Sequence, residues 1–335
     1  MSADTGIGRW TALEESDWRD RQRRHRERVE PWIAPRMARR SVGATHAVDD
    51  FLFDYYPYSP AKLRGWHPGA GTPLLGDARE FLAWPAYVEV DDGIAACRPL
   101  GGAAARRLRL VRRLLESTGS RPAQLGCFGL HEWAMVHGQD QDEVRHAALP
   151  LRLSPAAIAA TVADVGLRCT HIDAYRFFTQ TAVPLNAYSP TRDTQHELEQ
   201  PGCLHANMDL YKYAMWFSPY VGSELVADCF ALARTARELD MRAAPYDLSD
   251  LGYAPIRIET PAGRRTYAEQ QRELGVAANA LRAALLEALT TLVQWPGVGA
   301  PAAETTPTTG RSPVGQPSTA ASSASRAGTS EYQAQ

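Results

Sequence analysis

The sequence has few cysteines, and none of them is paired in a metal-binding or redox spacing. The five cysteines are scattered along the middle of the chain, and no C-x-x-C motif occurs. An odd number of cysteines without such pairs argues against a disulfide framework, and the missing C-x-x-C motifs exclude sites of the zinc-finger type. We therefore expect free thiols at Cys97, Cys127, Cys169, Cys203 and Cys229.

Long apolar runs and targeting signals are also missing. No uninterrupted apolar run approaches the roughly 20 residues that cross a bilayer. The N-terminal stretch MSADTGIGRW has no basic region followed by an apolar one. These absences predict a cytoplasmic protein without a membrane partner. The chain also lacks the G-x-S-x-G, phosphate-loop and dinucleotide-binding motifs.

Charge of one sign does not dominate, because the formal net charge is −2. No global basic field therefore attracts nucleic acid. Only two lysines occur, Lys62 and Lys212, and arginines form two local runs, RDRQRRHRER at 19–28 and RRLRLVRR at 106–113. Such runs are typical of solvated helix faces, and alternatively one of them contacts phosphate.

The composition that remains is that of an ordinary globular protein with a biased C-terminal end. Hydrophobic residues make up 44% of the chain and charged residues 22%. From about residue 296 the chain is rich in Ala, Thr, Ser, Pro and Gly, and it cannot bury enough apolar surface to order itself. We predict a flexible N-terminus at 1–9, one globular catalytic domain at 10–295 and a disordered tail at 296–335.

Hydrophobic spacing predicts a helix-rich domain. The run at 154–166 begins with Ser154 as an N-cap and Pro155 at the first helical position, and it stops at Gly166. The other expected helices are 10–41, 102–117, 221–240 and 266–294.

Short apolar stretches predict a few strands between these helices. The expected strands are 81–90, 149–154, the start of GLRCTHIDAYRFF at 166–178, and 255–260. The order strand, helix, strand at 149–178 resembles one βαβ unit. The fold class that follows is α+β or α/β, with helix in the majority and a few short strands.

Histidines cluster in one part of the chain, and this clustering is the main functional signal. Six of the nine histidines lie between His131 and His205. If His171 and Asp173 lie on a strand, their side chains share a face. His205 or His131 could then complete a two-His-one-carboxylate set, which is typical of non-haem Fe(II) sites. Alternatively, Asp173 pairs with Arg176 or orients His171.

The stretch EQPGCLHANMDLYKYAMW at 199–216 is compatible with two geometries. On a helix, His205 and Asp209 are i,i+4 neighbours and Lys212 is an i,i+3 partner of Asp209. On a strand they stand roughly 13 Å apart, with Asn207 between them. Asn207 or Asp209 could also cap a following helix.

Further polar side chains could complete a site. His131 and Glu132 are adjacent, so on a helix they diverge by about 100° and cannot hold one ion together. His67 lies in an aromatic loop rich in Pro and Gly, where it could line a pocket or be a satisfied polar group. Tyr175 lies among aromatic residues near His171.

Several segments resemble a family of actinobacterial proteins of about this size. They are CFGLHEWAMV at 127–136, HIDAYRFF at 171–178 and EQPGCLHANMDLYKYA at 199–214, with HAVDDFLFDYY, WHPG and DMRAAPYDL as further matches. The resemblance covers roughly residues 10–290. Members of this family are described as 3-methyladenine DNA glycosylases, so the resemblance implies hydrolysis of the N-glycosidic bond of alkylated bases. It transfers no catalytic residues.

One stretch of the chain bears on that implication. QWPGVG at 294–299 is similar to the turn of a helix-hairpin-helix DNA-binding element. Such an element needs a second helix after the turn, but Pro301 and a Thr/Pro/Ser-rich segment follow. No aspartate occurs after Asp250 to serve as the catalytic residue.

Three functions are compatible with these residues. The leading hypothesis is a metal-dependent enzyme acting on a small polar substrate, oxidative with iron, the favoured ion, or hydrolytic with zinc. One alternative is a DNA glycosylase that binds nucleic acid and uses Glu132, Asp173 or Asp209 as general base. The other is a non-catalytic binding module. In the leading hypothesis the metal ligands are His171, Asp173 and His205, the catalytic residues are His131, Glu132 and Asp209, and the substrate-binding residues are Arg176, Asn207, Tyr175 and His67.

Overall fold

The structure is a computed structural model that describes residues 11–91, 93–144 and 148–293, all of them within one compact unit. It is helix-rich with two short strands, which confirms the expected fold class. The predicted flexible N-terminus at 1–9, the predicted tail at 296–335 and the QWPGVG turn lie outside the described residues.

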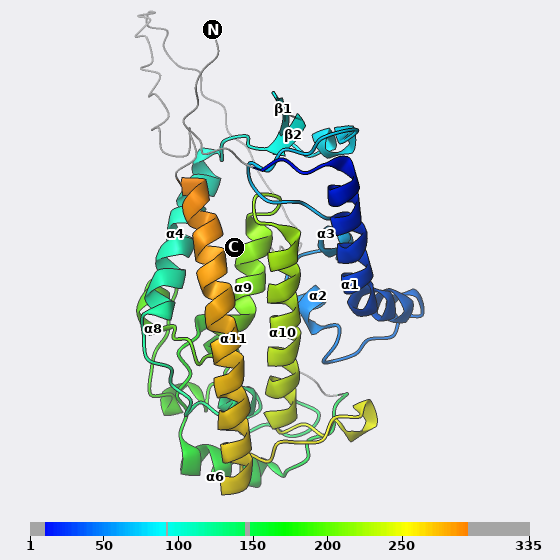
Figure 1. The fold of residues 1–335 in the computed structure, drawn as a ribbon. Helices are drawn as coiled ribbons and strands as arrows, with labels where there is room; N and C mark the ends of the chain where they lie inside the picture. The colour runs from blue at the N-terminus through cyan, green and yellow to red at the C-terminus, as the bar shows by residue number, and fades with distance from the viewer. Residues whose placement is uncertain (1–10, 92, 145–147, 294–335) are drawn as a thin grey trace, which may run out of the picture. The chain divides into compact units, whose positions relative to one another are not determined.

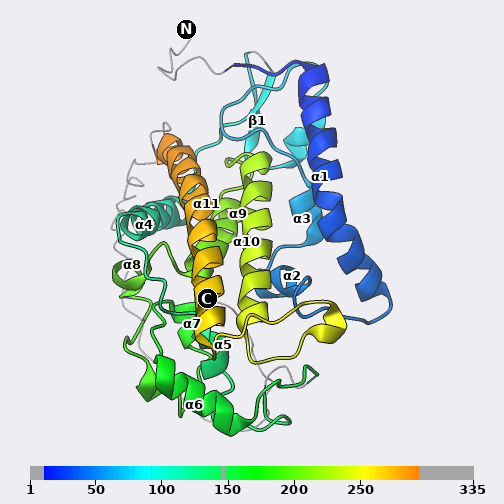
Figure 2. The same ribbon diagram turned by 60° about the horizontal axis from the view of Figure 1, so that its bottom comes forward.

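Four helices form the centre of this unit (Figures 1 and 2). They are α4 (Gly102–Gly119), α9 (Leu204–Trp216), α10 (Ser223–Ala243) and α11 (Pro261–Val293). α9 packs against α10 and α11, and α11 also packs against α4 and α10. The central position of α9 brings several elements within reach of its side chains.

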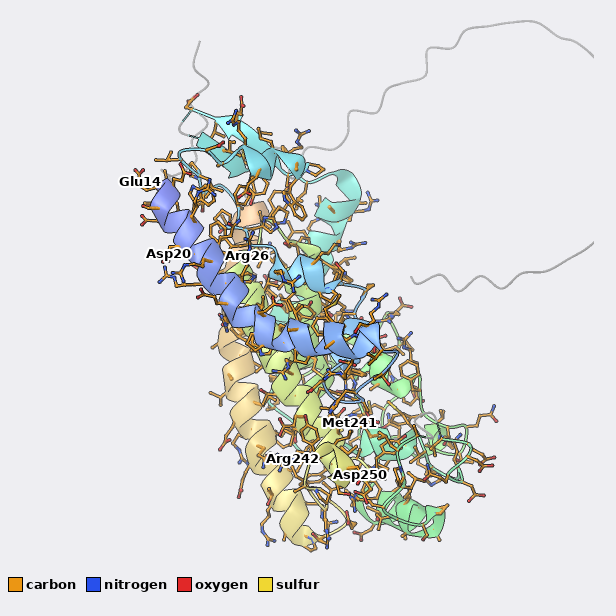
Figure 3. The ribbon with its side chains drawn as sticks, turned by 90° about the vertical axis from the view of Figure 1, so that its right-hand side faces the viewer. Glu14, Asp20, Arg26, Met241, Arg242 and Asp250 are labelled. Atoms are coloured by element: carbon orange, nitrogen blue, oxygen red, sulfur yellow. The ribbon has the colours of Figure 1, made fainter. Side chains whose placement is uncertain are left out.

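The remaining elements surround these helices. α1 (Glu15–Ser41) packs against α10 and against the short helix α3. The arginine run at 19–28, which includes the labelled Asp20 and Arg26, lies on α1 (Figure 3). The other elements are α2 (Phe51–Tyr55), α3 (Pro60–Arg64), α5 (Leu130–Ala134), α6 (Pro155–Val165), α7 (Ile172–Tyr175), α8 (Gln195–Leu198), and the 3-10 helices η1 (Arg79–Ala83), η2 (Val183–Leu185) and η3 (Ser249–Leu251).

The long helices confirm the predictions from periodicity and capping. In α4 the buried positions include Leu108, Val111 and Leu115, which form one stripe of the helix. α6 begins where expected, because the Ser154 side chain accepts a hydrogen bond from the backbone N–H of Ala157. Gly166 follows as its C-cap.

α9 is buried on almost every side. All of its residues are buried except Lys212 and Trp216. A helix in this position cannot send its polar side chains to water, so each buried polar group needs a partner within the protein. The polar residues His205, Asn207 and Asp209 therefore mark the places where α9 is connected to its neighbours.

Most of the predicted strands are wrong. In the part of the chain that the structure describes, the strands are β1 (Tyr87–Val90) and β2 (Gly93–Ala96), an antiparallel pair in which Tyr87 lies opposite Ala96. The predicted strand at 81–90 is correct in its second half. The stretch at 149–154 forms a single bridge, between Leu151 and Tyr246, and 255–260 forms no strand. The predicted βαβ unit is therefore absent from these residues, because its two predicted strands do not pair with each other. Residues 150–152 hydrogen-bond with 245–247, and Leu167 pairs with Asn186 and Ala187.

α11 has the length and composition of a membrane-spanning helix. One 18-residue window of it has a mean hydropathy of 1.4. In this structure α11 packs on α4, α9 and α10 through residues that include Leu274, Leu285 and Leu289. Length and composition alone are weak support for a membrane span, because the core helices of globular proteins pass the same test.

Candidate functional site

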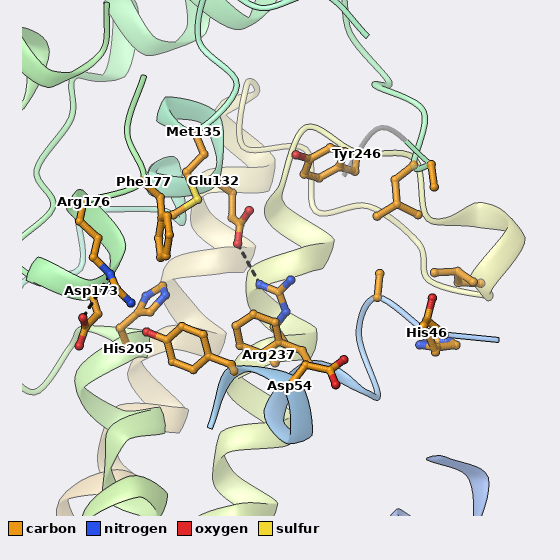
Figure 4. Close-up of a pocket in the computed structure, with 17 residues that line it drawn as sticks. His46, Asp54, Glu132, Met135, Asp173, Arg176, Phe177, His205, Arg237 and Tyr246 are labelled. Carbon is orange, nitrogen blue, oxygen red and sulfur yellow. Dashed lines mark hydrogen bonds and ion pairs between the residues drawn. The ribbon is translucent and has the colours of Figure 1, made fainter. Parts of the chain in front are cut away.

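A pocket of about 920 Å³ lies where α2, α5, α7, α9 and α10 meet (Figure 4). Its size is within the range of small-molecule sites. Phe51 and Tyr55 from α2 and Phe177 after α7 contribute aromatic walls. The charged and imidazole side chains in its lining are His46, Asp54, Glu132, Asp173, Arg176, His205 and Arg237.

A first group of potential metal ligands reaches this pocket through His205. His131 from α5, His205 from α9 and Asp240 from α10 are all buried, and each offers one ligand atom within 4.8 Å of the other two. Nε2 of His131 lies 2.6 Å from Oδ1 of Asp240. The rings of His131 and His205 have centroids 4.6 Å apart. These side chains could hold a metal ion.

Arg237 and Glu132 complete the surroundings of this group. Nη1 of Arg237 donates to Oε1 of Glu132 at 2.9 Å and to Oδ2 of Asp240 at 3.3 Å. Nε and Nη2 of the same guanidinium are buried and have no hydrogen-bond partner among the described residues. Arg237 and Glu132 both line the pocket, so the positive charge of this guanidinium lies beside the space that a bound molecule would occupy.

The two histidines of the first group differ in protonation state. Burial alone would lower the pKa of His131, but Asp240 outweighs it and raises this pKa well above the usual value. His205 has no such partner, and burial together with the nearby His131 lowers its pKa to about 3. His131 is therefore an imidazolium held by Asp240, whereas His205 is a neutral imidazole with a free lone pair.

A second group lies one helical turn further along α9. His171, Asp173 and Asp209 are buried and also offer atoms within 4.8 Å of one another. Nε2 of His171 is 3.1 Å from Oε1 of Glu199 and 3.5 Å from Oδ2 of Asp209. Burial opposes protonation of His171, but these two carboxylates outweigh it and raise the pKa of His171 to about 9.

Cations already neutralise the carboxylates of the second group. Asp209 accepts hydrogen bonds from Lys212 and, at 2.7 Å, from the Tyr56 hydroxyl. Asp173 forms ion pairs with Arg192 and Arg176. A metal ion would have to displace these donors.

Asp240 of the first group is paired in the same way, with His131 and Arg237. The first group nevertheless contains a neutral imidazole, His205, whereas the imidazole of the second group, His171, is protonated. The second group therefore fits a metal less well than the first.

The structure divides the predicted metal ligands between the two groups. His205 belongs to the first group, whereas His171 and Asp173 belong to the second. The rings of His171 and His205 are nevertheless close, with centroids 5.4 Å apart. The prediction that His171 and Asp173 lie on a strand is wrong, because Asp173 is in α7 and His171 is its N-cap residue.

The predicted catalytic and substrate-binding residues lie in several places. Glu132 and Arg176 line the pocket. Asp209 forms the network around His171 described above. Asn207 lies inside α9, whose N-cap is Cys203, so its predicted capping role is wrong. Its amide instead donates to the carbonyl of Pro201 at 3.0 Å and accepts from Arg282 at 2.6 Å.

Tyr175 and His67 are not among the residues that line the pocket. Tyr175 packs against Phe178, with ring centroids 5.2 Å apart. His67 lies in a separate small core, where Nδ1 is 3.1 Å from the Tyr87 hydroxyl.

Asp240 and Arg237 are site residues that we did not predict, although their spacing in the sequence marks them. In the helical pattern at 221–240, positions 226, 230 and 233 are buried apolar residues of α10. Arg237 and Asp240 continue that stripe at positions where helical spacing predicts apolar residues. A charge on the buried face of a helix needs a buried partner, and this requirement would have singled them out.

Comparison with known proteins identifies no relative. No family model, no curated protein and no solved structure matches the chain. The resemblance to the glycosylase family therefore stays a prediction, and the function has to be argued from the geometry of the site.

Proposed function

We propose that the protein is a metal-dependent enzyme in which His131, His205 and Asp240 hold a divalent cation beside the pocket. The observation that supports this most directly is that their ligand atoms are buried within 4.8 Å of one another. They come from three separate elements, α5, α9 and α10. The substrate would be a small polar molecule bound in the pocket of about 920 Å³.

The side chains fit such an ion in donor type. When His131 gives up the proton that it shares with Asp240, two imidazoles and one carboxylate form a two-His-one-carboxylate set, which suits iron(II) and also zinc. Nδ1 of His205 is buried without a hydrogen-bond partner among the described residues. Iron in such a set supports oxidations and zinc supports hydrolyses, and the donor set favours iron.

The protein's own residues would position the substrate. Arg237 lines the pocket, and a small movement of its side chain would expose the buried, unpartnered Nε and Nη2 so that they could donate to an anionic or carbonyl oxygen there. Glu132 holds the guanidinium in place through its contact at 2.9 Å. The guanidinium also lies over the ring of Phe51, with Cζ 3.8 Å from the ring centroid, which fixes its plane.

Metal binding by single-residue variants tests this proposal. The purified protein would be titrated with Zn(II), and anaerobically with Fe(II), and its metal content measured after dialysis. We expect one equivalent per chain, and at least a 10-fold weaker affinity in His205→Gln, because this change removes a neutral ligand without breaking an ion pair. His196→Gln, at a partly exposed histidine outside both groups, is the matched control and should bind like the wild type.

A second variant distinguishes the two groups. His171→Gln alters the second group and leaves the three proposed ligands in place, so it should retain one equivalent of metal. Loss of metal in His171→Gln but not in His205→Gln would show that the second group, and not the first, binds the ion. If the wild-type protein binds neither metal at micromolar concentration, the polar residues are a structural core and the proposal fails.

Glycosylase activity remains the alternative, but the site favours it less. The carboxylates expected to act as a general base are Glu132, Asp173 and Asp209. Each is already paired with a cation, which is Arg237, Arg192 and Lys212, respectively. Burial would raise the pKa of Asp173 and of Asp209, but Arg192 and Lys212 outweigh it and both pKa values are lowered, so these two carboxylates are weak bases. Release of 3-methyladenine from alkylated duplex DNA by the metal-free protein would support this alternative.

A further inference from the structure

A second pocket, of about 480 Å³, lies between α4, α8 and the C-terminal half of α9. α8 and α4 are in contact, and Figure 1 shows them next to each other. This basic groove shares no lining residue with the larger pocket. We define it by its charged and aromatic members: Arg106, Arg107, Arg113, Arg192, His196, Lys212, Tyr213 and Trp216.

The charge of the groove is of one sign. Five arginine and lysine side chains line it, and no aspartate or glutamate of the described residues does. Arg106, Arg107 and Arg113 form no ion pair within the described part of the chain, although their neighbour Arg112 pairs with Glu116. In a protein of net charge −2, three guanidinium groups without an ion pair along one groove form a local anion-binding surface.

The other arginine run of the sequence shows what a solvated helix face looks like here. On α1, Arg19 pairs with Glu15, Arg23 with Asp20 and Glu27, and Arg28 with Asp228. The two runs look alike in the sequence, but among the described residues only Arg26 of the α1 run lacks an ion pair, whereas only Arg112 of the α4 run has one. The charge on α4 is therefore available to a ligand.

Apolar surface lies beside these cations. Trp216 is 38% exposed and Leu110 is 67% exposed, and both line the groove. The Arg107 guanidinium lies 4.8 Å from the centroid of the Trp216 ring. An exposed indole next to a guanidinium plane offers a stacking surface for a flat aromatic ring. The groove thus combines a site for a ring with a site for a multiply charged anion.

We infer that the basic groove binds a nucleoside phosphate, with the base on Trp216 and the phosphate on Arg106, Arg107 and Arg113. Guanidinium groups bind carboxylate and phosphate oxygens alike through paired N–H donors, and three such groups in one groove favour the more highly charged phosphate over a single carboxylate. The volume lies at the lower end of the range for small-molecule sites, which suits one nucleotide unit. This unit could be a free nucleotide or part of a single-stranded nucleic acid.

Calorimetric titration of the full chain with four probes tests this inference. The probes are adenosine monophosphate, adenosine, inorganic phosphate and a single-stranded octamer of thymidine, each at about 50 mM salt. We expect adenosine monophosphate to bind at least 10-fold more tightly than adenosine or phosphate alone, because ring and phosphate have separate sites. Tighter binding of the octamer would identify nucleic acid as the source, and equal or weaker binding would identify a free nucleotide.

Variants at exposed positions locate the binding. Arg113→Ala should weaken binding of adenosine monophosphate at least 5-fold, and Trp216→Leu should remove the preference for the nucleotide over phosphate. Arg109→Ala is the matched control, because Arg109 is an exposed residue of the same helix that does not line the groove. The inference is overturned if no phosphate-containing probe binds at millimolar concentration, or if Arg109→Ala weakens binding as much as Arg113→Ala does.

Discussion

His67 shows what burial does to a single side chain away from the pocket. It is 3% exposed and lies among Phe81, Trp84 and Tyr87. Burial, with a small contribution from His25, lowers the pKa of His67 from its usual 6.5 to about 4. The imidazole is therefore neutral in the folded protein at pH values where it would be charged in the unfolded chain.

This difference predicts an acid-sensitive contribution to stability. The unfolded chain takes up a proton near pH 6.5 and the folded chain only near 4, so the stabilisation is complete above 6.5 and is lost as the pH falls toward 4. The loss should reach about 3 kcal/mol. The loss of stability between pH 7.5 and 4.5, measured by urea unfolding, should be smaller by about this amount in His67→Gln than in the wild type and His196→Gln, since the acid-sensitive contribution of His205 remains in all three. An equal loss in His67→Gln would contradict the assignment.

The sequence supplied the residue types of the candidate site but not their pairing. The clustering of histidines pointed correctly to His131, His171 and His205, which lie close together in the structure. Their ionic states depend on Asp240 and Glu199. Asp240 and His131 are 109 positions apart, and no local spacing relates residues at that separation.

At the scale of the element, length decided which predictions succeeded. The long helices α1, α4, α10 and α11 could be predicted because many turns repeat one apolar stripe. α7 has four residues, about one turn, which is too short to show a repeating apolar stripe. The sequence therefore does not distinguish this helix from the start of a strand. The sequence of α9 is compatible with both helix and strand, because this helix is buried on nearly all sides and lacks the polar face by which a helix is recognised.

The position of α9 against α11 depends on Asn207. Its amide joins the carbonyl of Pro201 to the guanidinium of Arg282, and both Asn207 and Arg282 are buried. Asn207→Ala would leave the carbonyl unpaired and the guanidinium with one acceptor fewer, at a cost of roughly 3 kcal/mol in the free energy of unfolding.

Asn279→Ala is the matched control, because Asn279 is exposed and accepts a hydrogen bond from the same guanidinium. It should cost less than about 1 kcal/mol in urea unfolding. Metal content should be unchanged in both variants, since neither side chain belongs to a ligand group. Loss of metal with unchanged stability in Asn207→Ala would instead support the predicted role of Asn207 at a functional site.

For the molecule as a whole, α9 connects the two ligand groups and the basic groove. His205 belongs to the first group, Asp209 to the second, and Lys212 and Trp216 line the groove. Lys212 has two functions in this arrangement, since it pairs with the buried Asp209 and also faces the groove. An exposed groove arginine such as Arg113 has no such partner in the described part of the chain.

This difference predicts that stability and nucleotide binding can be separated. Lys212→Met should lower the free energy of unfolding by roughly 3 kcal/mol, because it leaves the buried Asp209 carboxylate without its ammonium partner. It should also weaken binding of adenosine monophosphate. Arg113→Ala should weaken binding while changing the stability by less than about 0.5 kcal/mol. Urea unfolding and calorimetry on both variants measure the two effects, and equal destabilisation by the two substitutions would show that the groove cations do not differ in this way.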